Sequence, residues 1–368
     1  MRTFVKASAP ASARTLDAGW YLSPDVFSRE RERIFARSWI GVGRAEQIAD
    51  AGAFITAGIA GESLIVTRDA RGVPHAFYNV CRHRGTRMCE QDAGVFKGSI
   101  QCPYHAWTYG LDGTLVAARN MESTPDFDRA QYSLREAQIA QFEGFLFVAL
   151  DPEQPFAQAF EPLQGRFAAW EIGALRCAKR ITYELACNWK LVFQNYSECY
   201  HCPVIHPQLE RLSASESGRN DLIGGPFLGG YSTLRDERGS LTTTGHSSRA
   251  PLAGVRGEDL TRVYYYTIFP AMLLSLHPDY VMAHYVQPLE ASRTRVTCEW
   301  FFDAAAMQEP GFDASDAVEF WDLTNRQDWH VNELTQLGIA SRAYTPGPYS
   351  GQEGLLHAFD RHYLSLMQ

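Results

Sequence analysis

The spacing of hydrophobic and polar positions changes along the chain. In PDVFSRERERIFARS, residues 24–38, the apolar side chains recur at the spacing of one helix face, which predicts a short amphipathic helix. From residue 39 to about residue 150 the apolar residues form short runs between Gly- and Asp-containing turns, as in AFITAGIA, ESLIVTRD and FEGFLFVAL. Such runs are typical of β-strands. This part is therefore predicted to be a small all-β module.

A Pro-rich, acidic connector, DPEQPFAQAFEP at residues 151–162, follows the β module. Segments of this composition commonly separate domains. We therefore expect three parts: an N-terminal helical segment of residues 1–38 that packs on the last part, the β module of residues 39–155, and a larger domain of residues 156–368.

The larger domain mixes strands with helices. RITYELAC predicts a strand that runs into a helix from Trp189 to about Cys202, with Asn188 as its N-cap. Residues 220–259 are rich in Gly, Ser and Thr and predict a long loop. The segments VYYYTIF, YVMAHYVQPL and RTRVTCEWFFD predict an antiparallel meander, and helices near 314–337 and 351–366 close the chain. The expected class is α+β, with strands and helices segregated.

Composition narrows the class of protein. The chain has 368 residues, a formal net charge of −8 and 45% hydrophobic residues, which suits a globular protein and argues against nucleic-acid binding. No apolar run approaches the length of about 18 residues that a membrane span needs, and the N-terminus lacks a secretory pattern, so we expect a cytoplasmic protein. In a reducing compartment the eight cysteines suggest metal binding or burial rather than disulfides.

Residues 79–107, NVCRHRGTRMCEQDAGVFKGSIQCPYHAW, contain two mixed pairs of metal-ligand residues. Cys81-x-His83 and Cys102-x-x-His105 each follow a predicted strand. A structural zinc site usually pairs cysteine with cysteine and histidine with histidine, whereas a [2Fe–2S] cluster of the Rieske type needs two thiolates and two imidazoles. Here each of the two loops supplies one cysteine and one histidine, and this pattern predicts the Rieske cluster. Zinc, or four unrelated core residues, is the alternative.

The stretch NYSECYHCPVIHP, residues 195–207, contains a second group of metal-ligand residues. On a helix Glu198 and His201 share one face, while Cys199 and Cys202 share another. A non-haem Fe(II) that activates O₂ takes two imidazoles and a carboxylate, and His201 and His206 can supply the imidazoles. The two cysteines then pack in the core. The alternative is a zinc site that uses the cysteines and the histidines together.

Cys-x-His-Arg-Gly, Cys-x-x-His, Asn-Trp-Lys and Glu-x-x-His-x₄-His together resemble the catalytic α subunit of Rieske non-haem iron oxygenases, over nearly the whole chain. The resemblance implies a helix-grip fold for the larger domain and a third iron ligand on a late helix, which Asp328 matches. Asp322 and Glu333 are the alternatives. It also implies that Glu198 bridges the iron site to His105 of the partner subunit at a subunit interface.

The resemblance further implies a terminal oxygenase with O₂ as co-substrate. The chain has no dinucleotide fingerprint, so NAD(P)H would act only through a separate flavin and iron–sulfur reductase. Electron transfer across a subunit boundary implies a homo-oligomer, most simply a trimer.

Glu rather than Asp at position 198 resembles the subgroup that acts on quaternary ammonium compounds, such as glycine betaine, carnitine and choline. This implies N-demethylation through hydroxylation of an N-methyl group. Aromatic faces hold such cations best. The candidate cation-binding residues are Phe193, Tyr264, Tyr266, Tyr285 and Trp300, each of which can equally be core packing. The alternatives are hydroxylation or dihydroxylation of an aromatic or other small organic acid, and a Rieske electron carrier.

Overall fold

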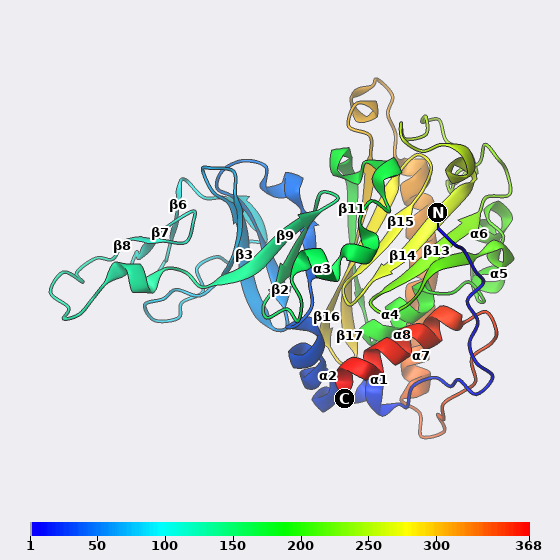
Figure 1. Ribbon diagram of the computed structural model, residues 1–368, viewed down its shortest axis with the longest axis horizontal. Helices are drawn as coiled ribbons and strands as arrows, with labels where there is room; N and C mark the ends of the chain where they lie inside the picture. Colours follow the sequence, from blue (N-terminus) through cyan, green and yellow to red (C-terminus); the bar gives the residue numbers. More distant parts are fainter. Residues whose placement is uncertain (1) are drawn as a thin grey trace. The chain divides into compact units, whose positions relative to one another are not determined.

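The computed structural model describes residues 2–368 and shows two compact units (Figure 1). One unit consists of residues 35–159, and the other combines the N-terminal residues up to 34 with residues 160–368. Antiparallel sheets form the core of both units, and the long helices belong to the larger one. The expected α+β class is confirmed.

The smaller unit contains a seven-stranded sheet in the order β1-β10-β9-β4-β3-β2-β5 and a three-stranded sheet β6-β7-β8. The loop after β4 and the loop between β6 and β7 carry the two Cys/His pairs, as the strand pattern predicted. Its strands are β1 (Ile40–Arg44), β2 (Ala53–Ile59), β3 (Glu62–Arg68), β4 (Pro74–Tyr78), β5 (Ala93–Val95), β6 (Ser99–Gln101), β7 (Thr108–Gly110), β8 (Leu115–Ala117), β9 (Glu136–Phe142) and β10 (Phe145–Ala149).

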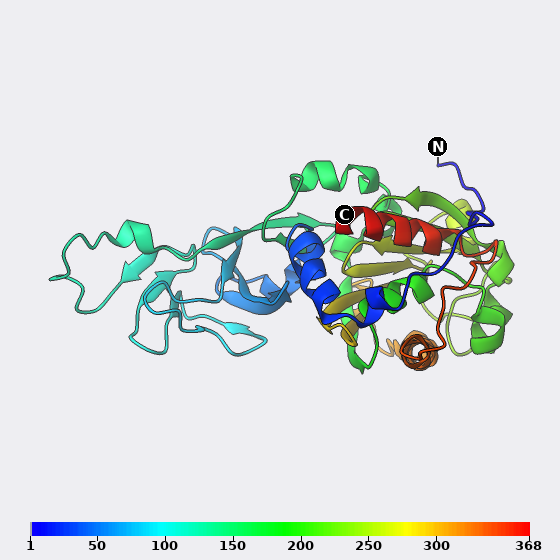
Figure 2. The same cartoon turned by 90° about the horizontal axis from the view of Figure 1, so that it is seen from below.

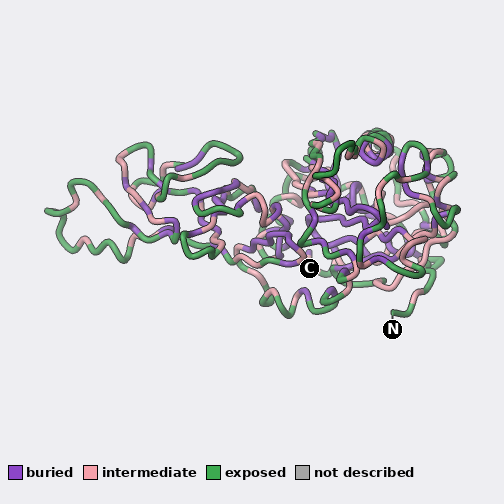
Figure 3. The backbone as a smooth tube through the Cα atoms, turned by 90° about the horizontal axis from the view of Figure 1, so that it is seen from above, coloured by how far each residue is buried: buried purple, intermediate pink, exposed green. Residues whose placement is uncertain are grey.

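The larger unit is built on one seven-stranded antiparallel sheet in the order β11-β17-β16-β15-β14-β13-β12. Strand β15 is buried along its whole length and β16 is buried in its first half, and the tube in Figure 3 shows this buried interior. The short strand β15 was not predicted, because MLLSL is too short a run to stand out from its neighbours. The strands are β11 (Arg176–Leu185), β12 (Arg219–Gly224), β13 (Phe227–Thr233), β14 (Arg262–Ile268), β15 (Met272–Leu276), β16 (Val281–Glu290) and β17 (Arg293–Phe302).

The long loop predicted for residues 220–259 is wrong in its first part, which forms the β12–β13 hairpin. Its glycines serve close strand packing rather than flexibility. A Cβ at Gly230 would lie 1.9 Å from the Arg219 carbonyl oxygen, and one at Gly229 would lie 2.1 Å from that of Tyr265. Glycine is required where backbones approach this closely. A glycine-rich sequence alone does not distinguish this requirement from a loop.

Three helices cover one face of the larger sheet, where rings of α4 and α7 contact Tyr265 of β14 (Figure 2). Helix α8 packs on α4 through stacked Phe193 and Phe359. The helix predicted for residues 189–202 ends earlier, at Tyr196, although Asn188 does cap it. The helices of this unit are α1 (Gly19–Leu22), α2 (Pro24–Glu30), α4 (Trp189–Tyr196), α5 (Cys202–Ile205), α6 (Pro207–Leu212), α7 (Ser315–Ile339) and α8 (Gly354–Met367).

A buried ion pair joins the N-terminal helix α2 to α4. Lys190 Nζ lies 2.5 Å from Glu30 Oε1, and both side chains are 0% exposed. Trp189 and Tyr363 donate further hydrogen bonds to the same carboxylate. Burial lowers the pKa of Lys190, and the negative charge of Glu30 opposes this effect. Each charge of the pair is therefore stabilised in the interior only while the other is present.

None of the helices formed by residues 2–368 has the length and apolar character needed to cross a lipid bilayer.

Candidate metal centres

Each of the two Cys/His loops of the smaller unit contains the same type of backbone turn. In each loop the N–H four residues after the cysteine donates to the cysteine carbonyl oxygen, at 3.0 Å from Gly85 to Cys81 and 3.1 Å from Ala106 to Cys102. Both donors have positive φ, 74° for Gly85 and 56° for Ala106. Similar turns thus present a cysteine and a histidine from each loop, even though the two Cys-to-His spacings differ.

The side chains of the two loops meet, with the cysteines buried in the core and the histidines partly exposed. Cys81 and Cys102 are 3% and 2% exposed, and the His83 and His105 ring centroids lie 4.7 Å apart. Nδ1 of His83 is buried and finds no hydrogen-bond partner among residues 2–368. Burial lowers the pKa of His83, which favours the neutral imidazole that a metal needs. Two thiols and two imidazoles in this arrangement fit a [2Fe–2S] cluster of the Rieske type.

The larger unit brings His201, His206 and Asp328 together, with candidate ligand atoms within 4.8 Å of one another. Asp328 Oδ1 lies 3.3 Å from Nε2 of His201 and 2.8 Å from Nε2 of His206. His201 precedes α5, His206 separates α5 from α6, and Asp328 lies in the middle of α7. Two imidazoles and one carboxylate with open positions fit a mononuclear non-haem iron.

A side-chain oxygen atom accepts a hydrogen bond from Nδ1 of each imidazole. His201 Nδ1 donates to Glu198 Oε1 at 2.5 Å, and His206 Nδ1 donates to Gln327 Oε1 at 2.8 Å. Because these oxygens accept from Nδ1, Nε2 is the nitrogen that faces Asp328, and a metal ion would bind there in place of the Nε2 proton. The Glu198–His201 contact was expected from helical spacing, but it occurs in a turn beyond the end of α4. Gln327 was not predicted; its position beside Asp328 is the only signal for it.

The two alternative acids are engaged elsewhere. Asp322 accepts hydrogen bonds from Tyr183 and Arg326, and Glu333 accepts from the Ala186 N–H. Both therefore support the sheet and helix around them, whereas Asp328 faces the two histidines.

Charge also favours a cation at this centre. Burial lowers the pKa of His201, but hydrogen bonds to the Asp328 and Glu198 carboxylates outweigh it and raise this pKa to about 10. Burial raises the pKa of Asp328, but hydrogen bonds from His201 and His206 outweigh it and leave this pKa below its usual value. A positive charge is thus stabilised between two carboxylates, as a bound Fe(II) requires.

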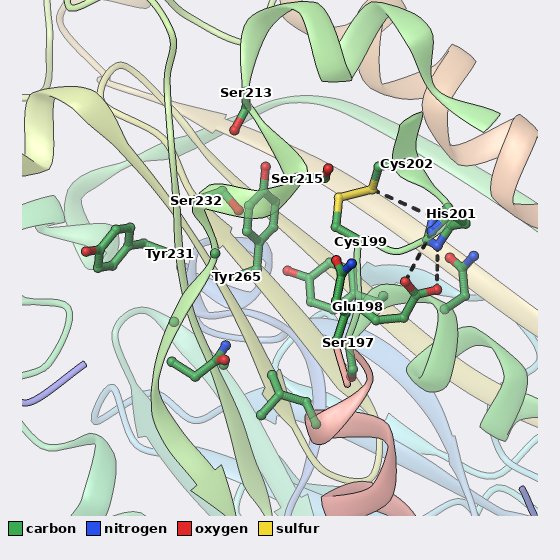
Figure 4. Close-up of a pocket in the computed structure, with 18 of the residues that line it drawn as sticks. Ser197, Glu198, Cys199, His201, Cys202, Ser213, Ser215, Tyr231, Ser232 and Tyr265 are labelled. Carbon is green, nitrogen blue, oxygen red and sulfur yellow. Dashed lines mark hydrogen bonds and ion pairs between the residues drawn. A yellow bond between two sulfur atoms is a disulfide. The ribbon is translucent and has the colours of Figure 1, made fainter. Parts of the chain in front are cut away.

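A cavity of about 160 Å³ opens beside these residues (Figure 4). An apolar cavity of about 150 Å³ is large enough for benzene, so a small organic molecule fits here. The three candidate iron ligands and Glu198 form one part of its wall. The aromatic part of the wall consists of Tyr196, Tyr231, Tyr265 and Trp321, and hydroxyl groups come from Ser197, Ser213, Ser215, Ser232, Thr267 and Thr324.

Among residues 2–368, the five aromatic residues predicted for substrate binding are not part of this wall. Tyr264 packs against Trp170, Tyr266 packs against Phe167, and Phe193 stacks on Phe359. Tyr285 lies in β16, and Trp300 is buried in β17.

Strand β14 shows why the prediction chose other residues. The period-2 pattern of VYYYTIF separates Tyr264 and Tyr266 from Tyr265 correctly, but the face of Tyr265 is the one that meets the cavity. Thr267 shares this face and also lines the cavity. The polar side chain of Thr267 was the sequence feature that could have identified the cavity face of β14. A strand face toward a binding site carries polar groups more often than a core face does.

The expectation that Cys199 and Cys202 are packed thiols is wrong. They form a disulfide with a Cα–Cα distance of 4.9 Å. The bond also removes both thiols from the alternative zinc site. The two residues were predicted to share a helix face, and their spacing of three residues does bring them together, but in the turn between α4 and α5.

Comparison with known protein families matches both units. Residues 172–368 match the family described as ring hydroxylating alpha subunit (catalytic domain), and residues 38–129 match the Rieske [2Fe-2S] domain.

Several known proteins are similar to this chain over most of its length. The glycine betaine monooxygenase oxygenase subunit of Pseudomonas aeruginosa strain UCBPP-PA14 is 30% identical, with 91% of this chain and 85% of the relative covered. The carnitine monooxygenase oxygenase subunit of Escherichia coli strain K12 is also 30% identical, with 91% and 87% covered. The crystal structure of the quaternary ammonium Rieske monooxygenase CntA with its substrate gamma-butyrobetaine superposes with a TM-score of 0.80 at 27% identity, covering 98% and 97%. The chain therefore belongs to the ring hydroxylating alpha subunit family of Rieske oxygenases, which makes it an oxidoreductase with a [2Fe–2S] cluster and a mononuclear iron.

Proposed function

We propose that this chain is the oxygenase component of a monooxygenase that demethylates a small quaternary ammonium compound such as glycine betaine. The observation that carries the proposal is the aromatic wall of the cavity beside His201, His206 and Asp328. The ring centroids of Tyr196 and Trp321 lie 6.0 and 6.3 Å from that of Tyr265. Aromatic faces attract a cation that has no N–H to donate. The similarity to glycine betaine and carnitine monooxygenases supports the same substrate class.

The metal ligands in this proposal come from both units. Cys81, His83, Cys102 and His105 would hold the [2Fe–2S] cluster, and His201, His206 and Asp328 would hold the mononuclear iron. When bound, the two centres supply electron transfer and O₂ activation.

The chain's own residues prepare the reaction. Glu198 and Gln327 fix the two imidazole rings, and the aromatic wall orients the substrate so that one N-methyl group faces the iron ligands. Hydroxylation of that methyl group gives a carbinolamine, which releases formaldehyde, so the net reaction is N-demethylation.

A substrate panel tests this function. With O₂ and a surrogate reductase, we expect formaldehyde from one or more of glycine betaine, carnitine and choline, and none from benzoate, because only the ammonium compounds carry an N-methyl group that the aromatic wall attracts. Formaldehyde release is measured against reductant consumed. A hydroxylated benzoate, with no formaldehyde from any ammonium compound, would favour the hydroxylation of small organic acids instead.

Tyr265 provides a more specific prediction about the aromatic wall. Replacing Tyr265 by Leu should raise KM for the ammonium substrate by roughly 5–30-fold, since about 1–2 kcal/mol of cation–π attraction is lost. Tyr265→Phe retains the aromatic face and should keep KM within about twofold of the wild-type value by the same reasoning. Steady-state kinetics with formaldehyde detection measures both variants. Equal KM values for the Leu and Phe variants would show that the ring does not hold the cation.

Glu198 is assigned the bridging role between the iron site and His105 of the partner subunit, in a trimer that receives electrons from a separate reductase. Replacing Glu198 by Gln keeps the size of the side chain and removes its charge. We expect product formation to fall by about 10–100-fold, as for other partners of metal ligands.

The same variant should leave the reduction of the cluster unchanged, since Glu198 acts after the cluster in the electron path. Stopped-flow absorbance of the cluster and product yield separate the two steps. Glu237→Gln, at an exposed position, is the matched control. Slow reduction of the cluster in Glu198→Gln would place this residue elsewhere in the path.

A further inference from the structure

The Cys199–Cys202 disulfide lies in the wall of the cavity (Figure 4). Its Cα–Cα distance of 4.9 Å falls within the range of about 4.4–6.8 Å that disulfides adopt. Cys202 is 3% exposed, whereas Cys199 is partly exposed. Cys199 is therefore the more accessible residue of the pair.

The disulfide joins the two ends of the segment that carries His201. Helix α4 ends at Tyr196 and α5 begins at Cys202, so the residues between them are not held by a continuous helix. Two links of the same span close this turn: the Cys199–Cys202 bond and, one residue earlier, the Glu198–His201 contact.

Sulfur also lies close to the atom that would bind iron. Cys202 Sγ is 4.0 Å from Nε2 of His201. The Glu198 carboxylate accepts hydrogen bonds from the Tyr200 and His201 N–H groups, so a shift of the turn would move the acid and the imidazole together.

We propose that Cys199–Cys202 is a thiol–disulfide exchange site that reacts with dithiols, and that its oxidised form holds Glu198 and His201 in place. One thiolate of the dithiol attacks Cys199 Sγ, the S–S bond breaks, and Cys202 leaves as a thiolate and takes up a proton. The second thiol of the reagent then displaces Cys199 as a thiol. The dithiol is oxidised to its disulfide, and the chain gains two electrons and two protons.

The chemical state of the pair can be measured on the iron-loaded protein without a variant. N-ethylmaleimide labelling followed by peptide mass spectrometry should find Cys199 and Cys202 unlabelled before treatment with dithiothreitol and labelled after it. Cys177, which is partly exposed and lies outside the disulfide, should be labelled in both samples. Two labelled thiols at 199 and 202 in the untreated protein, or a bond that resists dithiothreitol, would overturn the proposed exchange site.

The positioning role, which rests on the proposed iron site, is tested by the rate at which iron passes to a chelator. Reduced wild type and the C199S/C202S variant should both release the mononuclear iron roughly tenfold faster than oxidised wild type, which corresponds to 1.4 kcal/mol. Dithiothreitol should not accelerate release from C199S/C202S, and this control detects iron binding by the reagent itself. The absorbance of the cluster monitors the other centre.

The two proposals fail in different ways. Equal release rates in all samples would overturn the positioning role. The expected release rates, combined with no product from any ammonium compound, would reject the proposed substrate and support the exchange site.

Discussion

Replacing His201 by Ala should lower product formation by more than about 100-fold, because even the partners of metal ligands are worth about 10–100-fold. His201 supplies one of the two imidazoles near Asp328, and its loss leaves one imidazole and one carboxylate for the iron. The iron content should fall by one atom per chain, while the visible absorbance of the cluster should not change. Metal analysis, absorbance and formaldehyde yield measure the three effects.

His246→Ala is the matched control for this variant, since His246 is exposed in the larger unit. It should retain the iron, the cluster and the activity. Full product formation by His201→Ala would remove this histidine from the iron site, and loss of the cluster absorbance would show that the substitution disturbs the protein more widely.

The second large effect concerns stability. Replacing Lys190 by Met leaves the Glu30 carboxylate buried without its cation, which typically costs about 3–5 kcal/mol. The midpoint temperature and the midpoint denaturant concentration of unfolding should therefore both fall. Combining Lys190→Met with Glu30→Gln removes both charges and should recover much of the loss.

Denaturant unfolding followed by circular dichroism compares these variants. Lys179→Met, at an exposed site on β11, should change stability by less than about 0.5 kcal/mol. If Lys190→Met were as stable as Lys179→Met, the buried pair would contribute no net stabilisation.

Sequence patterns predicted those features that depend on local spacing. The α+β class, the strands before the two Cys/His loops and the cap at Asn188 all follow from short-range periodicity or from one side chain. The ligand assignments stay predictions, although the fold brings His201, His206 and Asp328 within reach of one metal ion.

The features that could not be predicted depend on long-range packing. Which face of β14 meets the cavity is decided by α4 and α7, whose rings lie on Tyr265 and not on Tyr264. The glycines of the β12–β13 hairpin were mistaken for a loop because the carbonyl oxygens that crowd them, from Arg219 of β12 and Tyr265 of β14, are brought close only by strand pairing. The Cys199–Cys202 disulfide is a local feature and was missed for a different reason, because composition alone favoured free thiols.

The β12–β13 hairpin limits how this cavity can be redesigned. Gly229 and Gly230 line the cavity, and each is fixed by a neighbouring carbonyl oxygen that leaves no room for a larger residue. At these two positions the wall is bare main chain, so neither position can accept a larger side chain. Directed evolution toward larger or smaller substrates would have to act on lining residues that carry exchangeable side chains, such as Tyr265 and Trp321.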